Sequence, residues 1–494
     1  MADARATPSS EPLLEPGRNC WRVENAGRAS LIVDAADYYR LAFEAILEAK
    51  SQILLIGWDV DTRVRLIDGK HPSGAPTGLG PLLTWLAKRR PELSIHILCW
   101  DEGLLHLPGR GTTLLRMIRW SFSRRVNLKW DSQHPLEGSH HQKILVIDDR
   151  IAFCGGIDIT GSRWDTRRHC DDEPGRRRPF TKRRYEPWHD ATMAVDGQAA
   201  SALGDLARIR WEVATGKPLP VPPRTCDDCW PKELEPTFRD VEIAIARTRG
   251  EEGAIEEVRE IEALFVDLIR CARSHVYVET QYFASRVVAE AIAERLGEPD
   301  GPEFVIVNPR TAWGWLDQTV MSPARQQLVE ALKERDKHGR FRIYAPVTEK
   351  RADIYVHAKI MIVDDLFLRV GSANMNNRSM GLDSECDLLV DGREDEKVRR
   401  TIGTLRCDLV AEHCGTTPDK VAKTLKKTGS LIATIEALQG DGRCLVRLKD
   451  EEPGDLKRKA VKSELFDPEG AGLFERRARP GLLSRLRQGR RRRG

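Results

Sequence analysis

The segment HHQKILVIDD, residues 140–149, recurs further along the chain as VHAKIMIVDD, residues 356–365. Both copies contain the pattern His-x-Lys-x-x-x-x-Asp, formed by His141, Lys143 and Asp148 in the first and by His357, Lys359 and Asp364 in the second. A glycine-led segment follows each copy at the same spacing, with Gly155, Gly156 and Asp158 after the first and Gly371, Ser372 and Asn374 after the second. Matching downstream spacing indicates a duplicated structural unit and not a local coincidence.

The similarity between the two copies extends upstream of the motifs. Residues 44–59, EAILEAKSQILLIGWD, and residues 263–283, ALFVDLIRCARSHVYVETQYF, both have the pattern of an amphipathic helix that leads into a buried strand. Apolar runs such as LSIHILCWD (93–101) and EFVIVNP (303–309) alternate with helical stretches. We therefore predict an α/β fold, with two pseudo-twofold-related α/β/α sandwich domains in one chain and one shared active site.

The length of 494 residues exceeds what one hydrophobic core usually supports. Proline clusters in GKPLPVPPRTCDDCWPKELEP, residues 216–236, which indicates a linker between domains. We predict a flexible N-terminal segment over 1–28, a first domain over 29–215, a Pro-rich linker over 216–245 and a second domain over 246–425. A C-terminal extension with a basic tail is predicted over 426–494.

The spacing inside each motif has a structural meaning. Side chains two apart on a strand point to the same face, so His141 and Lys143 share a face, as do His357 and Lys359. The Asp of each motif has the opposite parity and begins an acidic turn between two apolar strands, where it is suited to bracing backbone. If the two halves are related by a pseudo-twofold axis, both His-x-Lys pairs converge on one site.

Composition sets weaker bounds on location and partners. The N-terminal sequence has no apolar signal-peptide core and the chain has no run of 18 apolar residues, so we expect a cytoplasmic protein that meets the inner membrane face peripherally. The 11 cysteines are scattered, which favours free thiols, and Cys226 and Cys229 form a lone Cys-x-x-Cys that we interpret as linker. Net charge is only +4, but basic residues cluster over 176–184 and 476–494. Such clusters attract anionic lipid headgroups or nucleic acid.

The paired motifs, with GGID (155–158) and GSANMNNRS (371–379) downstream, resemble the phospholipase D superfamily. The resemblance covers roughly residues 30–415, and GSRWDTRRH (161–169), EPWHDATMAVDG (186–197) and YVETQYF (277–283) are similar to stretches of phosphatidylcholine-type phospholipases D and their bacterial relatives. It implies hydrolysis of the distal phosphodiester of glycerophospholipids to phosphatidate and a headgroup alcohol, with transphosphatidylation as a side activity.

The same resemblance implies roles for individual residues. By analogy with the family, His141 is the nucleophile that forms a phosphohistidine and His357 is the acid that protonates the leaving alcohol, while Lys143 and Lys359 stabilise the phosphate. Glu385 resembles the carboxylate that orients an imidazole in simple superfamily members, and we expect Asp165 to do this in the first half. Asp158, Ser372 and Asn374 are expected to bind phosphate or to orient its ligands. The chemistry needs no metal or other cofactor, because the two lysines supply the positive charge.

Two alternative functions stay open at this point. A cardiolipin-synthase-like transfer between two lipids would use the same site, and a nucleic-acid phosphodiesterase would explain the arginine clusters. The expected partners are a phospholipid bilayer surface and water or a small alcohol as acceptor. Nucleic acid is disfavoured because repeated aromatic platforms for bases are lacking. We expect a monomer, since both motifs lie in one chain.

Overall fold

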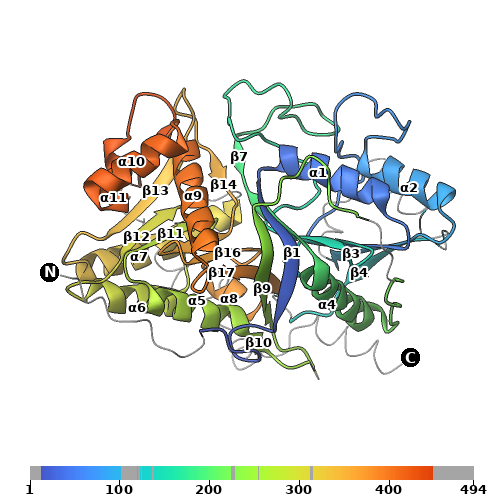
Figure 1. Ribbon diagram of the computed structural model, residues 1–494, viewed down its shortest axis with the longest axis horizontal. Coiled ribbons are helices and arrows are strands. Elements are labelled where there is room, and N and C mark those ends of the chain that lie inside the picture. Colours follow the sequence, from blue (N-terminus) through green and yellow to red (C-terminus); the bar gives the residue numbers. More distant parts are fainter. Residues whose placement is uncertain are drawn as a thin grey trace.

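The computed structural model describes residues 13–448, apart from 102–119, 121–122, 124, 136–137, 224–227, 254 and 312–314. Two halves of similar build lie side by side, and the long strands β1 (Arg22–Val33) and β9 (Phe238–Arg249) run next to each other between them (Figure 1). These two strands pair antiparallel from Arg22–Ile245 to Ala29–Phe238, and they join the halves into one 16-stranded sheet.

The order of the strands shows the pseudo-twofold relation directly. From the centre outward, β1-β8-β6-β5-β2-β3-β4 in the first half corresponds to β9-β17-β16-β15-β11-β12-β13 in the second. The first half contains β2 (Gln52–Gly57), β3 (Ser94–Trp100), β4 (Val126–Asp131), β5 (Ile144–Ile147), β6 (Ile151–Gly155), β7 (Trp188–His189) and β8 (Ala191–Asp196). The second contains β10 (Val258–Arg259), β11 (His275–Glu279), β12 (Glu303–Val307), β13 (Phe341–Val347), β14 (Tyr355–Val356), β15 (Ile360–Val363), β16 (Phe367–Gly371), β17 (Glu385–Asp391) and β18 (Cys444–Arg447).

Helices cover both faces of the sheet, as the predicted α/β/α layering requires. On one face, α4 (Gly197–Thr215) and α9 (Glu396–His413) share a single hydrophobic core that runs across both halves, with α10 (Pro418–Thr428) and α11 (Leu431–Ala437) at its edge. On the other face each half has a core of its own. The first lies under α1 (Ala35–Glu48) and α2 (Leu79–Arg89), and the second under α5 (Glu260–Cys271), α6 (Arg286–Leu296) and α7 (Trp315–Arg335).

Tight acidic turns join β5 to β6 and β15 to β16. Asp148 and Asp149, and likewise Asp364 and Asp365, have φ values of 51° to 55°, a backbone conformation that short polar side chains tolerate. The carboxylate of Asp148 accepts hydrogen bonds from the backbone N–H groups of Lys50, Ser51 and Gln52 at 2.6–2.8 Å. Asp364 makes the equivalent bonds to residues 273–275. The motif aspartates therefore brace the start of the neighbouring strand in each half.

The boundaries predicted from sequence differ from the observed elements. Strand β1 begins at Arg22, inside the segment expected to be flexible, and β9 begins at Phe238, inside the expected linker. Helix α11 and β18 lie in the expected C-terminal extension, yet β18 pairs with β13 as an edge strand. These differences have one cause. The sheet is continuous across the molecule, so strands outside each repeated unit either extend the sheet at its edge or join the two halves. The basic tail, residues 476–494, and Cys226 lie outside the described residues.

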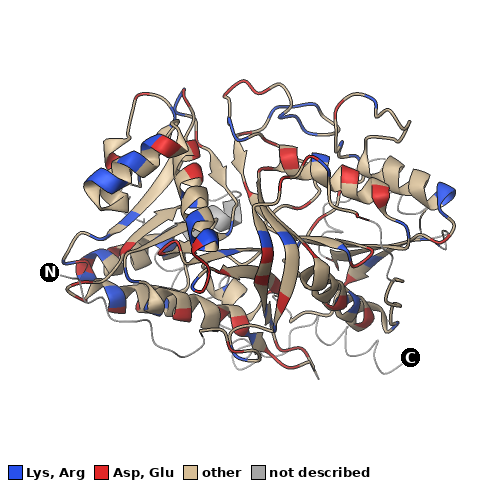
Figure 2. Ribbon diagram, in the orientation of Figure 1, with Lys and Arg blue, Asp and Glu red and all other residues tan. Residues whose placement is uncertain are grey.

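Charged side chains of both signs are interspersed over the surface helices (Figure 2). Within the basic cluster at 176–184, Arg176 is buried against Asp165, whereas Arg184 is exposed and pairs with Asp172. Among the described helices, none combines the length and the apolar character needed to span a bilayer.

Candidate active site

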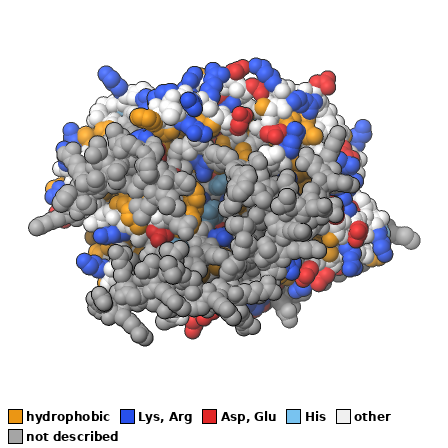
Figure 3. Space-filling view, turned by 180° about the vertical axis from the view of Figure 1, so that it is seen from behind, with side chains coloured by type: hydrophobic (Ala, Val, Ile, Leu, Met, Phe, Trp, Pro, Cys, Tyr) orange, Lys and Arg blue, Asp and Glu red, His pale blue; other side chains and the backbone are white. Residues whose placement is uncertain are grey.

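The two motif histidines meet at the boundary between the halves. Their ring centroids lie 6.3 Å apart, with the ring planes at 60°. His141 lies three residues before β5 and His357 three residues before β15, so the duplicated strand brings each imidazole to the same end of its half. Seen from behind, histidine side chains and blue basic side chains are visible in a hollow near the middle of the molecule (Figure 3).

Each histidine is held by a carboxylate that the other half supplies. His141 Nδ1 lies 3.0 Å from Oε1 of Glu385, and His357 Nδ1 lies 2.7 Å from Oδ2 of Asp190. Short parallel pairings create this crossed arrangement: His140 bridges Ser384, and β14 pairs with β7. Because Nδ1 of both rings is engaged, Nε2 is the nitrogen that each imidazole has for chemistry.

Glu385 fits the expected orienting role, but it orients the histidine of the opposite motif. Its carboxylate also accepts hydrogen bonds from Ser372 Oγ at 2.5 Å and Ser379 Oγ at 2.7 Å. Ser372 therefore supports the carboxylate, whereas we expected it to bind phosphate or to orient its ligands.

The structure corrects the expectation for Asp165. This residue is fully buried 3.1 Å from His169 Nδ1 and 3.1 Å from Arg176, and the carboxylate at His357 is Asp190. The spacing of the second half could not locate this carboxylate, because the segment between β6 and β8 is much longer than the one between β16 and β17. A usable signal was present: Asp190 immediately precedes β8, and Glu385 begins the equivalent strand β17.

The motif lysines lie beside the histidines and are almost fully buried. Lys143 Nζ donates to the carbonyl of His141 at 2.6 Å and lies 3.3 Å from Asp158, which also accepts the N–H of Trp58. Lys359 Nζ bonds the carbonyl of His357 and lies 3.5 Å from Gln281 Oε1. Asn374, at the position equivalent to Asp158, has a buried Oδ1 without a hydrogen-bond partner among the described residues.

Burial and the lysines determine the protonation of the site. Burial, together with Lys143 and Lys359, lowers the pKa of His141 well below its usual value, and burial with Lys359 does the same for His357. Burial raises the pKa of Asp190 to about 7 and that of Glu385 to about 8. Burial also lowers the pKa of Lys359 to about 7. The site thus resists further positive charge until an anion arrives, and a phosphodiester is such an anion.

Comparisons with known proteins agree with this geometry. A family model described as Phospholipase D matches residues 321–428, which contain the second motif. Phospholipase D1 of Schizosaccharomyces pombe is 26% identical over 385 residues, covering 58% of this chain. Phospholipase D alpha 1 of Nicotiana tabacum is 25% identical over 519 residues, covering 76% of this chain. The chain is therefore similar to phospholipases D over much of its length, and the family model covers its second motif.

The chain is shorter than the relatives that it matches. The chain spans 28% of the length of the first relative and 63% of the second. Among solved structures, phosphatidylserine synthase of Haemophilus influenzae Rd KW20 matches with a TM-score of 0.51 at 13% identity, covering 83% of this chain and 94% of that one. That match supports the α/β fold with its large sheet.

Proposed function

We propose that this chain is a phospholipase D-type phosphodiesterase and phosphatidyltransferase that cleaves the distal phosphodiester of phosphatidylcholine-like glycerophospholipids. The observation that carries the proposal is the crossed pair of His–carboxylate contacts, flanked by the two buried lysines. Phosphodiester cleavage needs a nucleophile, an acid for the leaving alcohol and fixed positive charge on the phosphate oxygens. The two imidazoles and the two lysines would supply all three within one site.

The reaction would proceed in two displacements. His141 Nε2 attacks phosphorus, the bond from phosphorus to the headgroup oxygen breaks, and His357 Nε2–H gives its proton to that oxygen. Water or another alcohol then gives a proton to His357, attacks phosphorus and breaks the phosphorus–nitrogen bond. Phosphatidate or a phosphatidyl alcohol is released, and both imidazoles return to their starting states. The assignment of His141 as the nucleophile rests on the family resemblance, since the geometry treats the two rings alike.

Lys143 and Lys359 would stabilise the charge on the non-bridging oxygens. Each Nζ is already held by the carbonyl of its motif histidine, so little side-chain ordering is needed when phosphate enters. Asn374 is buried at the position equivalent to Asp158, with its Oδ1 unpartnered among the described residues, and its NH₂ group would donate to phosphate.

The proposal is tested with mixed liposomes of phosphatidylcholine and phosphatidylglycerol, ethanol, and a labelled oligonucleotide, with products identified by mass. We expect phosphatidate and phosphatidylethanol from the wild type, and a loss of at least about 10³-fold in the His141→Ala and His357→Ala variants. His275→Ala, which removes an imidazole outside the site, should act as wild type.

Other products would reject the proposal in defined ways. Cardiolipin as the main product would favour transfer between two lipids. Cleaved oligonucleotide with intact lipid would replace the lipid assignment altogether. Activity that survives both histidine substitutions would mean that the paired site is not the catalytic one.

A further inference from the structure

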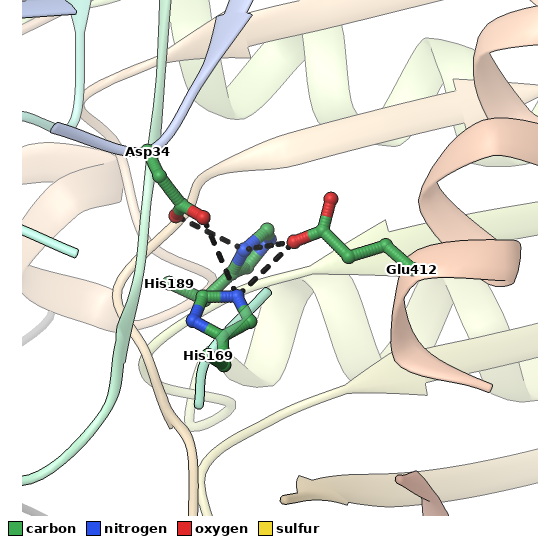
Figure 4. A group of neighbouring side chains, drawn as sticks. All are labelled: Asp34, His169, His189 and Glu412. Atoms are coloured by element: carbon green, nitrogen blue, oxygen red, sulfur yellow. Dashed lines mark hydrogen bonds and ion pairs between the residues drawn. The ribbon is translucent and has the colours of Figure 1, made fainter. Parts of the chain in front are cut away.

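Four buried side chains converge next to the candidate active site without taking part in it. They are Asp34, His169, His189 and Glu412, and one nitrogen or oxygen atom from each lies within 4.8 Å of all the others (Figure 4). Three come from separate parts of the first half, and Glu412 comes from α9 in the second. The cluster therefore connects the two halves. It lies next to the active site, because His189 directly precedes Asp190, the carboxylate that contacts His357.

The distances in the cluster have the dimensions of a metal site. His169 Nε2 lies 3.4 Å from Asp34 Oδ2 and 3.1 Å from Glu412 Oε1. His189 Nδ1 lies 3.3 Å from Asp34 Oδ1 and 3.2 Å from Glu412 Oε1. Ligands about 2.0–2.1 Å from a tetrahedral zinc ion lie about 3.3 Å from one another. The two separations from Glu412 Oε1, 3.1 and 3.2 Å, are close to this edge length. Those from Asp34 run to its two different oxygens, and one atom from each of the four residues lies within 4.8 Å of the others.

Hydrogen bonding alone leaves part of the cluster unexplained. His189 Nδ1 and Asp34 Oδ2 are buried and lack hydrogen-bond partners among the described residues, although imidazole and carboxylate face each other. Asp34 also occupies the N-cap of α1 with φ of 67° yet makes no side-chain cap bond. An N-cap Asp ordinarily accepts a backbone N–H of the first helical turn, so this carboxylate has been directed elsewhere.

The surroundings of the two imidazoles are those of metal ligands. His189 Nε2 lies 2.8 Å from Glu279 Oε2, and His169 Nδ1 lies 3.1 Å from Asp165 Oδ2. A metal-bound histidine characteristically has its other nitrogen on a carboxylate, which fixes the tautomer and increases its basicity. Arg167 bonds the outer oxygen of Glu412 at 2.5 Å, so that carboxylate is oriented as well.

We propose that Asp34, His169, His189 and Glu412 bind one divalent transition-metal ion, of which zinc is the best fit, in a buried tetrahedral site that joins the two halves. Two imidazoles and two carboxylates suit a borderline ion such as Zn²⁺ better than Mg²⁺ or Ca²⁺, which prefer oxygen ligands only. The ion and its two carboxylates would be neutral together, which suits a buried site.

The site would act on catalysis by positioning. The carbonyl of His189 accepts the N–H of His357 at 2.7 Å, and Oδ1 of Asp34 accepts the N–H of Asp190 at 3.0 Å. The backbone N–H groups of His357 and Asp190 are thus each held by a proposed metal ligand: His189 holds the first and Asp34 the second. The ion itself would not contact substrate.

The test begins with the untagged full-length protein, dialysed against Zn²⁺ and then against metal-free buffer. We expect about one zinc ion per chain by mass spectrometry, and a melting temperature that falls on removal by chelator and returns with Zn²⁺ but not with Mg²⁺. Co²⁺ in place of zinc should give the intense visible absorption of a tetrahedral site. This readout needs no variant and is independent of activity.

Variants locate the ion. Glu412→Gln and His169→Gln should lower zinc affinity at least 100-fold. Glu279→Gln changes the carboxylate behind His189, which also contacts Tyr277 and His413, and should lower zinc affinity about 10–100-fold. His275→Gln and Cys229→Ser are the matched controls, and both should keep one zinc ion per chain. Absence of bound metal, a six-coordinate cobalt spectrum, loss of zinc in Cys229→Ser, or full zinc content in Glu412→Gln would each overturn the proposal.

Discussion

Glu385 is fully buried, and it holds His141 Nδ1 and two serine hydroxyls at once. Burial raises the pKa of this carboxyl to about 8, whereas burial and the nearby lysines lower the pKa of His141. Below pH 8 the His141–Glu385 pair therefore carries one proton more than its reactive form. As a nucleophile, His141 must be neutral with Nδ1–H on ionised Glu385. Loss of that proton should therefore produce the acidic limb of kcat/KM.

The Glu385→Gln variant tests this protonation argument. Without the carboxyl, the limb depends on His141 alone, whose pKa is lowered, so the limb should move to lower pH while the plateau falls about 10–100-fold. A pH profile of kcat/KM on short-chain lipid measures both effects. Glu233→Gln, a substitution on the exposed surface, is the control. An acidic limb that stays in place would show that another group sets it.

Asp190 and Asp165 offer a second test at the scale of single residues. Asp190→Asn removes the carboxylate at His357 and should lower kcat by about 10²–10⁴-fold with the fold intact. Asp165→Asn leaves Arg176 buried beside a neutral amide, which should lower the free energy of unfolding by about 3 kcal/mol or more while kcat per folded molecule changes less than about tenfold. Chemical denaturation and initial rates separate the two variants. Equal kinetic losses would contradict the distinction.

Sequence reasoning could find the motif residues and, through the family resemblance, Glu385, but it could not find Asp190. His141, Lys143, His357 and Lys359 are visible because duplication repeats their spacing. Asp190 is not, because its partner lies on the other half of the chain and is reached only through the pairing of β7 with β14. Contacts that cross between repeated units leave no periodic signal within either unit.

At the scale of elements, the turn between β5 and β6 depends on the carboxylate of Asp148. Asp148 accepts three backbone N–H groups from the start of β2 and has φ of 53°. Asp148→Ala removes these bonds and places a less tolerant residue in the left-handed region, so the free energy of unfolding should fall by about 3 kcal/mol. Phosphatidyl transfer per folded molecule should change little, because this carboxylate does not face the histidines.

Thermal unfolding and specific activity of the folded fraction measure this pair of expectations. Asp37→Ala, in the first turn of α1, is a control that removes an exposed carboxylate. A catalytic loss with normal stability would assign Asp148 to the reaction instead of the hairpin.

At the scale of the whole molecule, the crossed contacts make each half incomplete. The duplication predicts two similar units, and the strand orders agree with it. What the sequence does not indicate is that β1 and β9 pair and fuse the units into one sheet, since nothing in the pattern of either strand identifies its neighbour. The linker therefore matters less than the sheet for holding the site together.

Cutting the chain between the halves tests this conclusion. A protease site introduced after Val221, which is 65% exposed, should be cleaved without separating the products, because β1–β9 pairing and the core under α4 and α9 cross the boundary. The two fragments should co-elute on gel filtration with kcat within about twofold of the intact chain. Fragments 1–221 and 222–494 produced separately should be inactive, since His141 then lacks Glu385 and His357 lacks Asp190. Activity should return when they are refolded together, and a fragment active alone would refute the shared site.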